Sequence, residues 1–259
     1  MRSIGFFART IGLAGAAACM ATLAIAADPK PDFSLKTRAL EASVFLDEKI
    51  KSDAALAANC LAEGKKWAEK NRDDAEKERK SDPSLFRNGS WTMERKYLTR
   101  SIVDERYISI VREDYEYTGG AHPNSSSDTI LWDKSAGKRI SIRSFFTETA
   151  DNGPTMKAMR QGVIASLQAE KKKRGAEDTD ASAIEAIEPK LLKIGPVSLT
   201  PSTEQGKSSG LTFHYSPYSY AEGGYVAFVP WEKLKPYLTP EGARIFGGAR
   251  PKDDEDPPQ

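Results

Sequence analysis

Hydrophobic residues recur at two different spacings along the chain, and the change of spacing separates an early helical part from a later strand-rich part. Between residues 40 and 80 the apolar positions recur at steps of three and four residues and no proline interrupts them, which predicts a helix or a helical pair with one buried stripe. The stripe consists of Leu46, Ile50, Ala54, Ala57, Leu61 and Ala68. Gly64 is a candidate break in this helical pattern.

Aromatic and β-branched residues are concentrated between residues 91 and 142, where they predict strands. The predicted strands are Trp91–Arg100, Arg106–Tyr117, Ile130–Trp132 and Ile140–Ile142. Residues 101–105 can form a turn, and residues 133–137 have the length and composition of a hairpin connection. The pattern predicts an antiparallel meander, with Phe145 and Phe146 closing its apolar face.

The second half of the chain alternates between helical and strand patterns. A helix is predicted to begin at Pro154, to bury Met156, Met159, Val163 and Leu167, and to end at the basic run before Gly175. A short helix at 180–188, strands at 196–199, 210–216 and 224–229, and a closing short helix at 231–238 follow. The fold class is therefore predicted as α+β, an antiparallel sheet covered by helices, with an N-terminal helical extension.

The first 26 residues have the composition of a secretory signal peptide. Arg2 and Arg9 flank the start of an apolar run that finishes at Ala24-Ile25-Ala26, an A-x-A cleavage site. The alternative, a membrane anchor, is disfavoured because the apolar run is short for a span. We therefore expect a periplasmic or secreted protein with four parts: a signal peptide (1–26), a helical N-terminal region (27–89), an α+β domain (90–246) and a disordered acidic tail (247–259).

Charge and cysteine content narrow the range of partners. Removal of residues 1–26 takes away two arginines and no acid, so the formal net charge changes from +1 to −1. No global charge then draws the chain to nucleic acid, and no membrane span is expected after signal removal. Cys60 is the one cysteine left, which excludes an internal disulfide, and its simplest role is that of a small apolar helix residue.

Two glycine-containing corners, each next to tyrosines, are the candidate binding surface. At the first corner Gly119 and Gly120 can adopt positive φ, and Pro123 restricts the backbone of His122, so the imidazole should have a defined direction. We predict that the two corners adjoin and form one recognition surface, since tyrosine offers apolar area with a polar tip. The predicted binding residues are Tyr115, Tyr117, Gly119, Gly120, His122, Asn124, Tyr218, Tyr220 and Glu222. The alternative is that such aromatic residues simply fill the core of the sheet.

Catalytic chemistry has less support in the sequence. Zinc typically needs three protein ligands, and the two histidines, even with Asp128, Asp133 or Glu222, lack a metal-binding spacing. No cofactor, metal or nucleophile is therefore predicted, although paired carboxylates for glycoside cleavage stay open because their separation is not visible in a sequence.

Several motifs resemble those of one family of exported bacterial proteins, over roughly residues 90–238. The motifs are Tyr115–His122, Gly137–Ile142 followed by Phe145-Phe146, Leu211–Tyr218, Tyr220–Gly223 and Val226–Trp231. Together they resemble the RsiV-type domain of unknown function, which occurs in the lysozyme-binding anti-sigma factor RsiV and beside the catalytic domain of a peptidoglycan deacetylase. The chain departs from both proteins, because it has neither a span after the signal peptide nor a deacetylase domain.

The resemblance implies a non-catalytic binding module of the cell envelope, with a protein such as lysozyme or a peptidoglycan glycan as its partner. One alternative is an enzyme of cell-wall carbohydrate that uses His122 and nearby carboxylates. Another is a purely structural periplasmic domain, which would lack a concave or exposed aromatic surface at the two corners.

Overall fold

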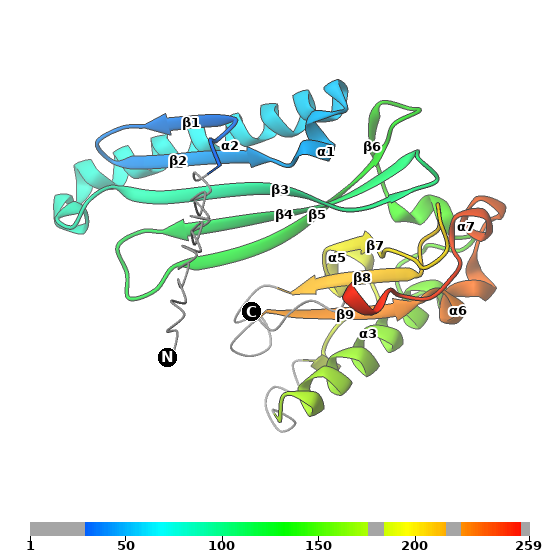
Figure 1. Cartoon of the computed structure of the whole chain (residues 1–259). Coiled ribbons are helices and arrows are strands. Elements are labelled where there is room, and N and C mark those ends of the chain that lie inside the picture. Colours follow the sequence, from blue (N-terminus) through cyan, green and yellow to red (C-terminus); the bar gives the residue numbers. More distant parts are fainter. Residues whose placement is uncertain (1–28, 176–183, 216–223, 255–259) are drawn as a thin grey trace, which may run out of the picture. The chain divides into compact units, whose positions relative to one another are not determined.

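The computed structural model describes residues 29–175, 184–215 and 224–254 (Figure 1). Contacts divide the chain into two units, residues 1–30 and residues 31–259, and all the elements below belong to the second unit. The predicted signal peptide lies outside the described residues. Within the described ranges, no helix combines the length and the apolar character needed to cross a bilayer.

The larger of two sheets has six strands in the order of the sequence. They are β1 (Phe33–Lys36), β2 (Leu40–Leu46), β3 (Trp91–Val103), β4 (Tyr107–Tyr117), β5 (Asn124–Asp133) and β6 (Lys138–Ile140). All neighbours pair antiparallel except β2 and β3, which are parallel. The predicted α+β class and the meander of β3 to β6 are confirmed, and Phe145 and Phe146 are buried as predicted.

The predicted helix start at residue 40 is wrong. Residues Leu40–Leu46 form β2, whose even-numbered residues are buried while the odd-numbered ones are half-buried. Leu40, Ala42, Val44 and Leu46 thus satisfy a strand period of two, and pairing with β3, from Leu40 opposite Trp91 onward, decides between the two patterns. The N-terminal region therefore adds two strands to the sheet instead of forming a purely helical extension.

Helices begin only after Asp47. The short α1 (Glu48–Lys51) and the long α2 (Ala54–Ser81) are each capped by an aspartate, and the Asp53 carboxylate accepts a 2.9 Å hydrogen bond from the Leu56 amide. The buried residues of α2 are Leu56, Cys60, Gly64, Ala68 and Ala75, so the stripe starts later than predicted and Ala54 is exposed. Burial raises the pKa of the Cys60 thiol to about 12, which keeps it protonated as a small apolar group.

Gly64 is a close-packing position and not a break in α2. A Cβ atom at this position would lie 2.7 Å from Cγ1 of Val44, so the missing side chain lets the helix approach β2. The same device recurs on the smaller sheet, where a Cβ at Gly162 would lie 2.7 Å from Cγ1 of Val229. On each sheet, the main helix packs closely because a helix glycine lies opposite a strand valine.

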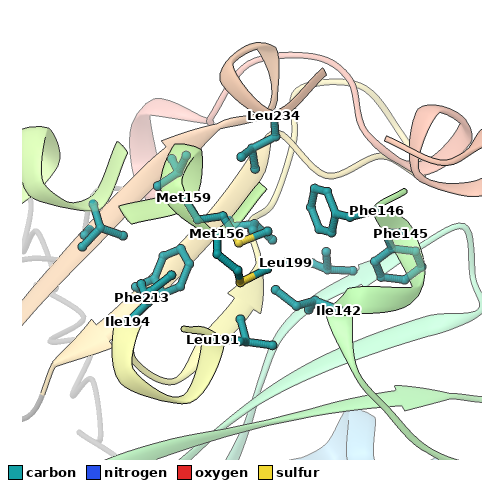
Figure 2. Packing of buried hydrophobic residues seen from close by; sticks show 14 of the residues in the cluster. Ile142, Phe145, Phe146, Met156, Met159, Leu191, Ile194, Leu199, Phe213 and Leu234 are labelled. Atoms are coloured by element: carbon teal, nitrogen blue, oxygen red, sulfur yellow. The ribbon is translucent and has the colours of Figure 1, made fainter. Parts of the chain in front are cut away.

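The smaller sheet has three antiparallel strands, β7 (Val197–Leu199), β8 (Gly210–Tyr215) and β9 (Tyr225–Pro230). Helix α3 (Pro154–Lys173) packs on it with the four residues predicted from the sequence, Met156, Met159, Val163 and Leu167. Figure 2 shows Met156 and Met159 among the buried side chains of this core. The remaining short elements are α5 (Leu191–Ile194), α6 (Trp231–Leu234), α7 (Pro240–Ile245) and the 3₁₀ turns η1 (Pro83–Phe86), η2 (Ile142–Phe145), η3 (Lys235–Tyr237) and η4 (Lys252–Asp254).

The predicted disorder of residues 247–259 is wrong for residues 247–254. Asp254 at the end of η4 is 6% exposed and forms ion pairs with Arg100 and Arg250. An acidic, proline-rich composition predicts a solvated tail, but the ion pairs of Asp254 with two arginines hold this segment against the folded domain. Residues 255–259 lie outside the described part.

The edge of strand β7 lies against the face of the larger sheet. Hydroxyl groups of that sheet form hydrogen bonds with the backbone amide and carbonyl groups along this edge. The Leu199 amide donates to Ser109 Oγ at 2.9 Å, and the Leu199 carbonyl accepts from Ser101 Oγ at 2.7 Å. The Val197 amide donates to Thr129 Oγ1 at 3.0 Å. Three adjacent strands of the larger sheet, β3, β4 and β5, therefore each contribute one hydroxyl to the edge of β7.

A β-bulge in β3 makes this contact geometrically available. Thr99 lies opposite Ile110 and Ser101 opposite Ser109, so Arg100 is the extra residue. Before the bulge, Tyr97 faces the core under α2; after it, Val103 faces the core of the smaller sheet. The bulge thus turns the odd-numbered side chains of β3 from one face of the sheet to the other.

Replacing Gly64 by alanine should destabilise the protein. The new methyl group clashes with Val44, which costs about 1–3 kcal/mol, while the gain in helix propensity returns only about 1 kcal/mol. Urea unfolding of G64A, V44A and the double variant measures the free energies of unfolding. We expect the double variant to lose less than the sum of the single variants; additive losses would contradict the proposed contact.

Replacing Ser109 by alanine should cost about 1–3 kcal/mol of unfolding free energy, because the buried Leu199 amide loses its acceptor. The matched control is Ser126→Ala, which removes an exposed hydroxyl from β5 and should change stability by less than about 0.5 kcal/mol. Equal urea midpoints for Ser109→Ala and the control would show that the edge contact contributes little.

Candidate functional site

A cleft of about 740 Å³ opens over the part of the larger sheet that the smaller sheet leaves uncovered. Its floor consists of side chains from β3, β4 and β5, arranged in rows across the strands. One row is Glu94, Tyr115 and Ser125, and the next is Lys96, Glu113 and Ser127. Leu98 and Val111 form the apolar end of the floor.

The walls come from the second half of the chain. The last turns of α3 contribute Ser166, Ala169, Glu170, Lys173 and Arg174, and the strand wall contributes His214, Tyr215, Gly224, Tyr225, Val226, Phe228 and Arg250. Residues distant in sequence thus share one concave surface, since β4 and β9 face each other across it. This composition combines aromatic rings, hydroxyls and charges, which is typical of ligand sites.

Two side chains of the cleft floor are unusually exposed for their type. Leu98 is 38% exposed and Tyr115 is 39% exposed, which places them among the five most exposed large hydrophobic side chains of the described residues. Leu98 lies on β3 and Tyr115 on β4, the two neighbouring strands of the floor. Exposed apolar area inside a concave surface is a feature of binding sites.

Two basic side chains of the cleft, Lys96 and Arg174, form ion pairs with acidic residues of the same cleft. Lys96 lies 2.7 Å from Glu94, and Arg174 lies 2.8 Å from Glu170. The Arg174 guanidinium also stacks on Tyr225, 4.3 Å from the ring centre, and donates to the carbonyl of Gly224. These pairs fix the side chains in defined positions without leaving a strong local charge.

His214 forms a buried pair with Ser198. Its Nε2 lies 2.8 Å from Ser198 Oγ, and next to this pair Thr200 and Thr212 share a hydroxyl–hydroxyl bond of 2.8 Å. Burial, with the positive charges of Arg100 and Arg250, lowers the pKa of His214 to about 4, so the ring is neutral at pH 7. Ser198 is 2% exposed and does not line the cleft, so the pair resembles a cross-strand polar contact more than a nucleophile and its base.

The first predicted corner forms the hairpin between β4 and β5. Gly119 has φ of +86°, as expected, whereas Gly120 has no positive φ. His122 is exposed and its Nδ1 lies 3.0 Å from the carbonyl of Pro123, while Asn124 opens β5 opposite Glu116.

Among the nine predicted binding residues, Tyr115 lines the cleft, whereas Tyr117, Gly119, Gly120, His122 and Asn124 do not. Tyr218, Tyr220 and Glu222 lie outside the described residues. The predicted meeting of the two corners therefore stays a prediction, although Gly224, at the end of the second corner, lines the same cleft as Tyr115.

Two of the three carboxylates considered with the histidines for metal binding have other partners, and the third, Glu222, lies outside the described residues. Asp128 pairs with Arg112 at 3.0 Å, and Asp133 pairs with Arg106 at 2.7 Å. In the described ranges, no group of three side chains capable of holding a metal ion is found.

Sequence reasoning missed Arg100, Arg250 and the serines of β5 as cleft residues. Ser125-Ser126-Ser127 lies outside the predicted strand Ile130–Trp132, but it pairs with β4 as part of β5 and lines the cleft. Arg100 has no local signal because it reaches the cleft through a bulge, and Arg250 belongs to a segment predicted as disordered. In the sequence, the three serines 125–127 are the one sign that β5 begins before Ile130.

No family model matches the chain, and no curated protein matches it. Solved structures with a similar arrangement include a DUF3298 family protein from Pseudomonas aeruginosa PAO1 and another from Bacteroides fragilis NCTC 9343. The first is 19% identical with a TM-score of 0.46, and the match covers 62% of this chain and 66% of that protein, just under two thirds of its length. The second is 17% identical with a TM-score of 0.47, covering 77% of this chain and 84% of the other. These neighbours belong to a family of domains of unknown function, and the resemblance to RsiV-type domains stays a prediction.

The free energy of unfolding should decrease as the pH is lowered, because the pKa of His214 is lower in the folded protein than in the unfolded chain. Its folded pKa of about 4 lies below the ordinary value of 6.5, so between these values the unfolded chain binds the proton and the folded chain does not. The contribution lost on acidification is roughly 3 kcal/mol. Urea unfolding from pH 7 to pH 4 should show a flatter decline for His214→Gln than for wild type; parallel curves would contradict this assignment.

Proposed function

We propose that the chain is a non-catalytic binding module of the bacterial cell envelope, and that its cleft holds a short segment of cell-wall glycan. The observation that carries the proposal is the exposure of Leu98 and Tyr115 in the floor of a concave, hydroxyl-lined surface. An isolated structural domain has no need to leave these two side chains uncovered at the bottom of a cleft.

The size of the cleft favours a glycan over a protein partner. Stable protein partners cover about 800 Å² on each side, usually on rather flat surfaces, whereas ligand sites are concave with volumes of about 300–1,000 Å³. At about 740 Å³ the cleft falls within the second class. Lysozyme, the other partner that the family resemblance implies, is therefore the second choice.

The chemistry of the lining supports carbohydrate recognition. Tyr115 and Tyr225 offer ring faces with polar tips, on which the apolar face of a sugar ring can pack. Ser125 and Ser127 project from β5 beside Tyr115 and Glu113, where their hydroxyls can exchange hydrogen bonds with sugar hydroxyls. The side chains belong mainly to strands, which hold them in place before a ligand arrives.

Binding without turnover fits the ionic state of the cleft better than hydrolysis. Glu94 and Glu170 are each paired with a cation, so neither is placed as an unpaired acid or base. His122 lies in the exposed hairpin and does not line the cleft. We propose that this hairpin, with Gly119, Gly120 and His122, borders the cleft as a rim, since it joins the two strands of the floor.

The proposal predicts that Tyr115→Ala weakens binding to glycan by about tenfold, or 1.4 kcal/mol, because its ring forms the exposed part of the floor. The measurement is retention of the purified protein on insoluble peptidoglycan, together with calorimetric titration of N-acetylglucosamine oligomers. The matched control is Tyr117→Ala, two residues along the same strand and outside the cleft, which should bind like wild type.

Unchanged binding by a folded Tyr115→Ala variant would place the site elsewhere. Retention on immobilised lysozyme with no retention on peptidoglycan would replace the glycan by a protein partner. Release of reducing sugars that stops in His122→Ala would favour the enzymatic alternative.

A further inference from the structure

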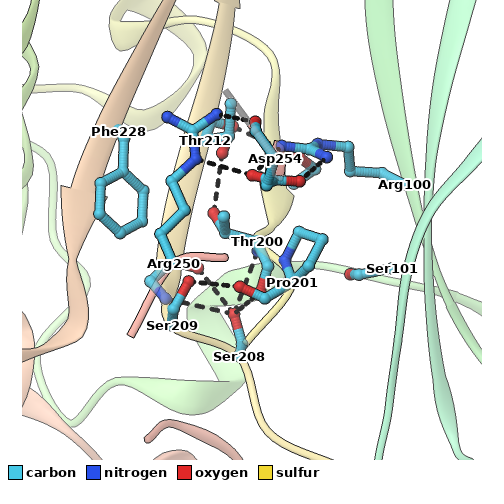
Figure 3. Close-up of polar contacts among 12 residues, drawn as sticks. Arg100, Ser101, Thr200, Pro201, Ser208, Ser209, Thr212, Phe228, Arg250 and Asp254 are labelled. Atoms are coloured by element: carbon cyan, nitrogen blue, oxygen red, sulfur yellow. Dashed lines mark hydrogen bonds and ion pairs between the residues drawn. The ribbon is translucent and has the colours of Figure 1, made fainter. Parts of the chain in front are cut away.

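Two arginines on the wall of the cleft share a single carboxylate. Arg100 forms a two-pronged ion pair with Asp254, and its Nη2 lies 2.7 Å from Asp254 Oδ2. Arg250 Nε approaches the same oxygen at 2.7 Å, so Asp254 lies between the two guanidinium groups (Figure 3). The arginine side chains are 15% and 18% exposed, and that of Asp254 is 6% exposed.

Arg100, Arg250 and Asp254 together carry two positive charges and one negative charge. Two other basic residues of the cleft each have an acidic partner of their own. Lys96 and Arg174 each have one acidic partner, Glu94 and Glu170, whereas two guanidinium groups face Asp254 alone in the described structure. Among the described residues, one positive charge is therefore in excess on this mostly buried wall. The lowered pKa of His214, to which both arginines contribute, is consistent with this excess.

The cluster also has hydrogen-bonding capacity left over and faces the cleft. Arg100 and Arg250 line the cleft, but Asp254 does not, so the carboxylate lies behind the two cations. Nε of Arg100 is buried without a hydrogen-bond partner among the described atoms. The Arg250 guanidinium lies 5.2 Å from the ring centre of Phe228, which restricts its movement.

The local backbone explains why Arg100 reaches this place. It is the extra residue of the β3 bulge, and bulges redirect a side chain that a regular strand would place on one of its two faces. Held from behind by Asp254, the planar guanidinium groups keep a fixed orientation toward the cleft. Guanidinium groups bind carboxylates through parallel hydrogen bonds, which makes them selective for this group.

We propose that Arg100 and Arg250 form a carboxylate-binding subsite of the cleft, with Asp254 as the residue that positions them. The inference rests on the proposed function and refines it: the preferred glycan carries a carboxylate, either on the sugar itself or on an attached peptide. The neutral part of the ligand packs on the floor around Tyr115, and its carboxylate reaches the arginines on the wall.

The test compares two disaccharides of equal length by calorimetric titration. One consists of two N-acetylglucosamine units and is neutral; the other replaces one unit by N-acetylmuramic acid and carries one carboxylate. Wild type should bind the acidic disaccharide about tenfold more tightly, the ratio expected for one charge-assisted contact. The dipeptide alanyl-glutamate is the third probe, and it distinguishes a peptide carboxylate from a sugar carboxylate.

Arg100→Gln and Arg250→Gln should lower the ratio of the two affinities to about one, with little change for the neutral disaccharide. Lys138→Gln is the matched control, because it removes the same charge at an exposed position outside the cleft and should keep the ratio. If the single variants do not fold, the charge-balanced Arg100→Gln/Asp254→Asn variant takes their place. In wild type, the Nε–H resonance of Arg100 should shift with the acidic disaccharide and not with the neutral one.

The outcomes separate the inference from the proposed function. Binding of both disaccharides with an unchanged ratio in the folded arginine variants, or an equal loss in Lys138→Gln, would overturn the carboxylate subsite and leave the glycan cleft. Absence of binding to both disaccharides, with arginine-dependent binding of the dipeptide, would overturn the glycan and leave the subsite. If the Nε–H resonance of Arg100 does not shift at saturating concentrations of the acidic disaccharide or the dipeptide, the subsite is likewise overturned.

Discussion

The contact between the edge of β7 and the hydroxyls of the larger sheet is the constraint on which the site depends. A strand edge buried without partners would leave several backbone groups unsatisfied, at about 1–3 kcal/mol each. Ser101, Ser109 and Thr129 provide these partners from the face of the sheet, where a fourth strand of the small sheet would otherwise be required. The contact fixes the place where the two sheets meet, and the floor beyond it stays open as the cleft.

The bulge at Arg100 connects this joint to the chemistry of the cleft. If Arg100 were an ordinary ladder residue of a regular strand, Ser101 and Val103 would face α2, and β3 could offer neither a hydroxyl to Leu199 nor an apolar side chain to the second core. The same residue then carries the guanidinium group on the cleft wall. A single insertion in the strand therefore serves both the packing of the two sheets and the electrostatics of the site.

Close helix packing complements these polar contacts. Gly64 and Gly162 bring α2 and α3 near enough to their sheets for a valine to fill the space of a missing side chain. Helix α2 thus packs closely against the larger sheet, and α3 packs closely against the smaller one. The junction of the two sheets is polar at the cleft and apolar in the core cluster that includes Val103, Phe145 and Leu199.

Local periodicity in the sequence is enough to predict the meander from Trp91 onward and the helix from Pro154 with its buried stripe. Each follows from spacing and backbone preference within one segment. The fate of residues 40–46 was decided by tertiary structure, because an apolar stripe at steps of three and four residues and a strand alternation overlap there and pairing with β3 selects the strand. The cleft and its arginines were likewise decided by tertiary structure. Arg100 and Asp254 are 154 residues apart, and no local pattern encodes the bulge, the edge contact and the ion pair that bring them together.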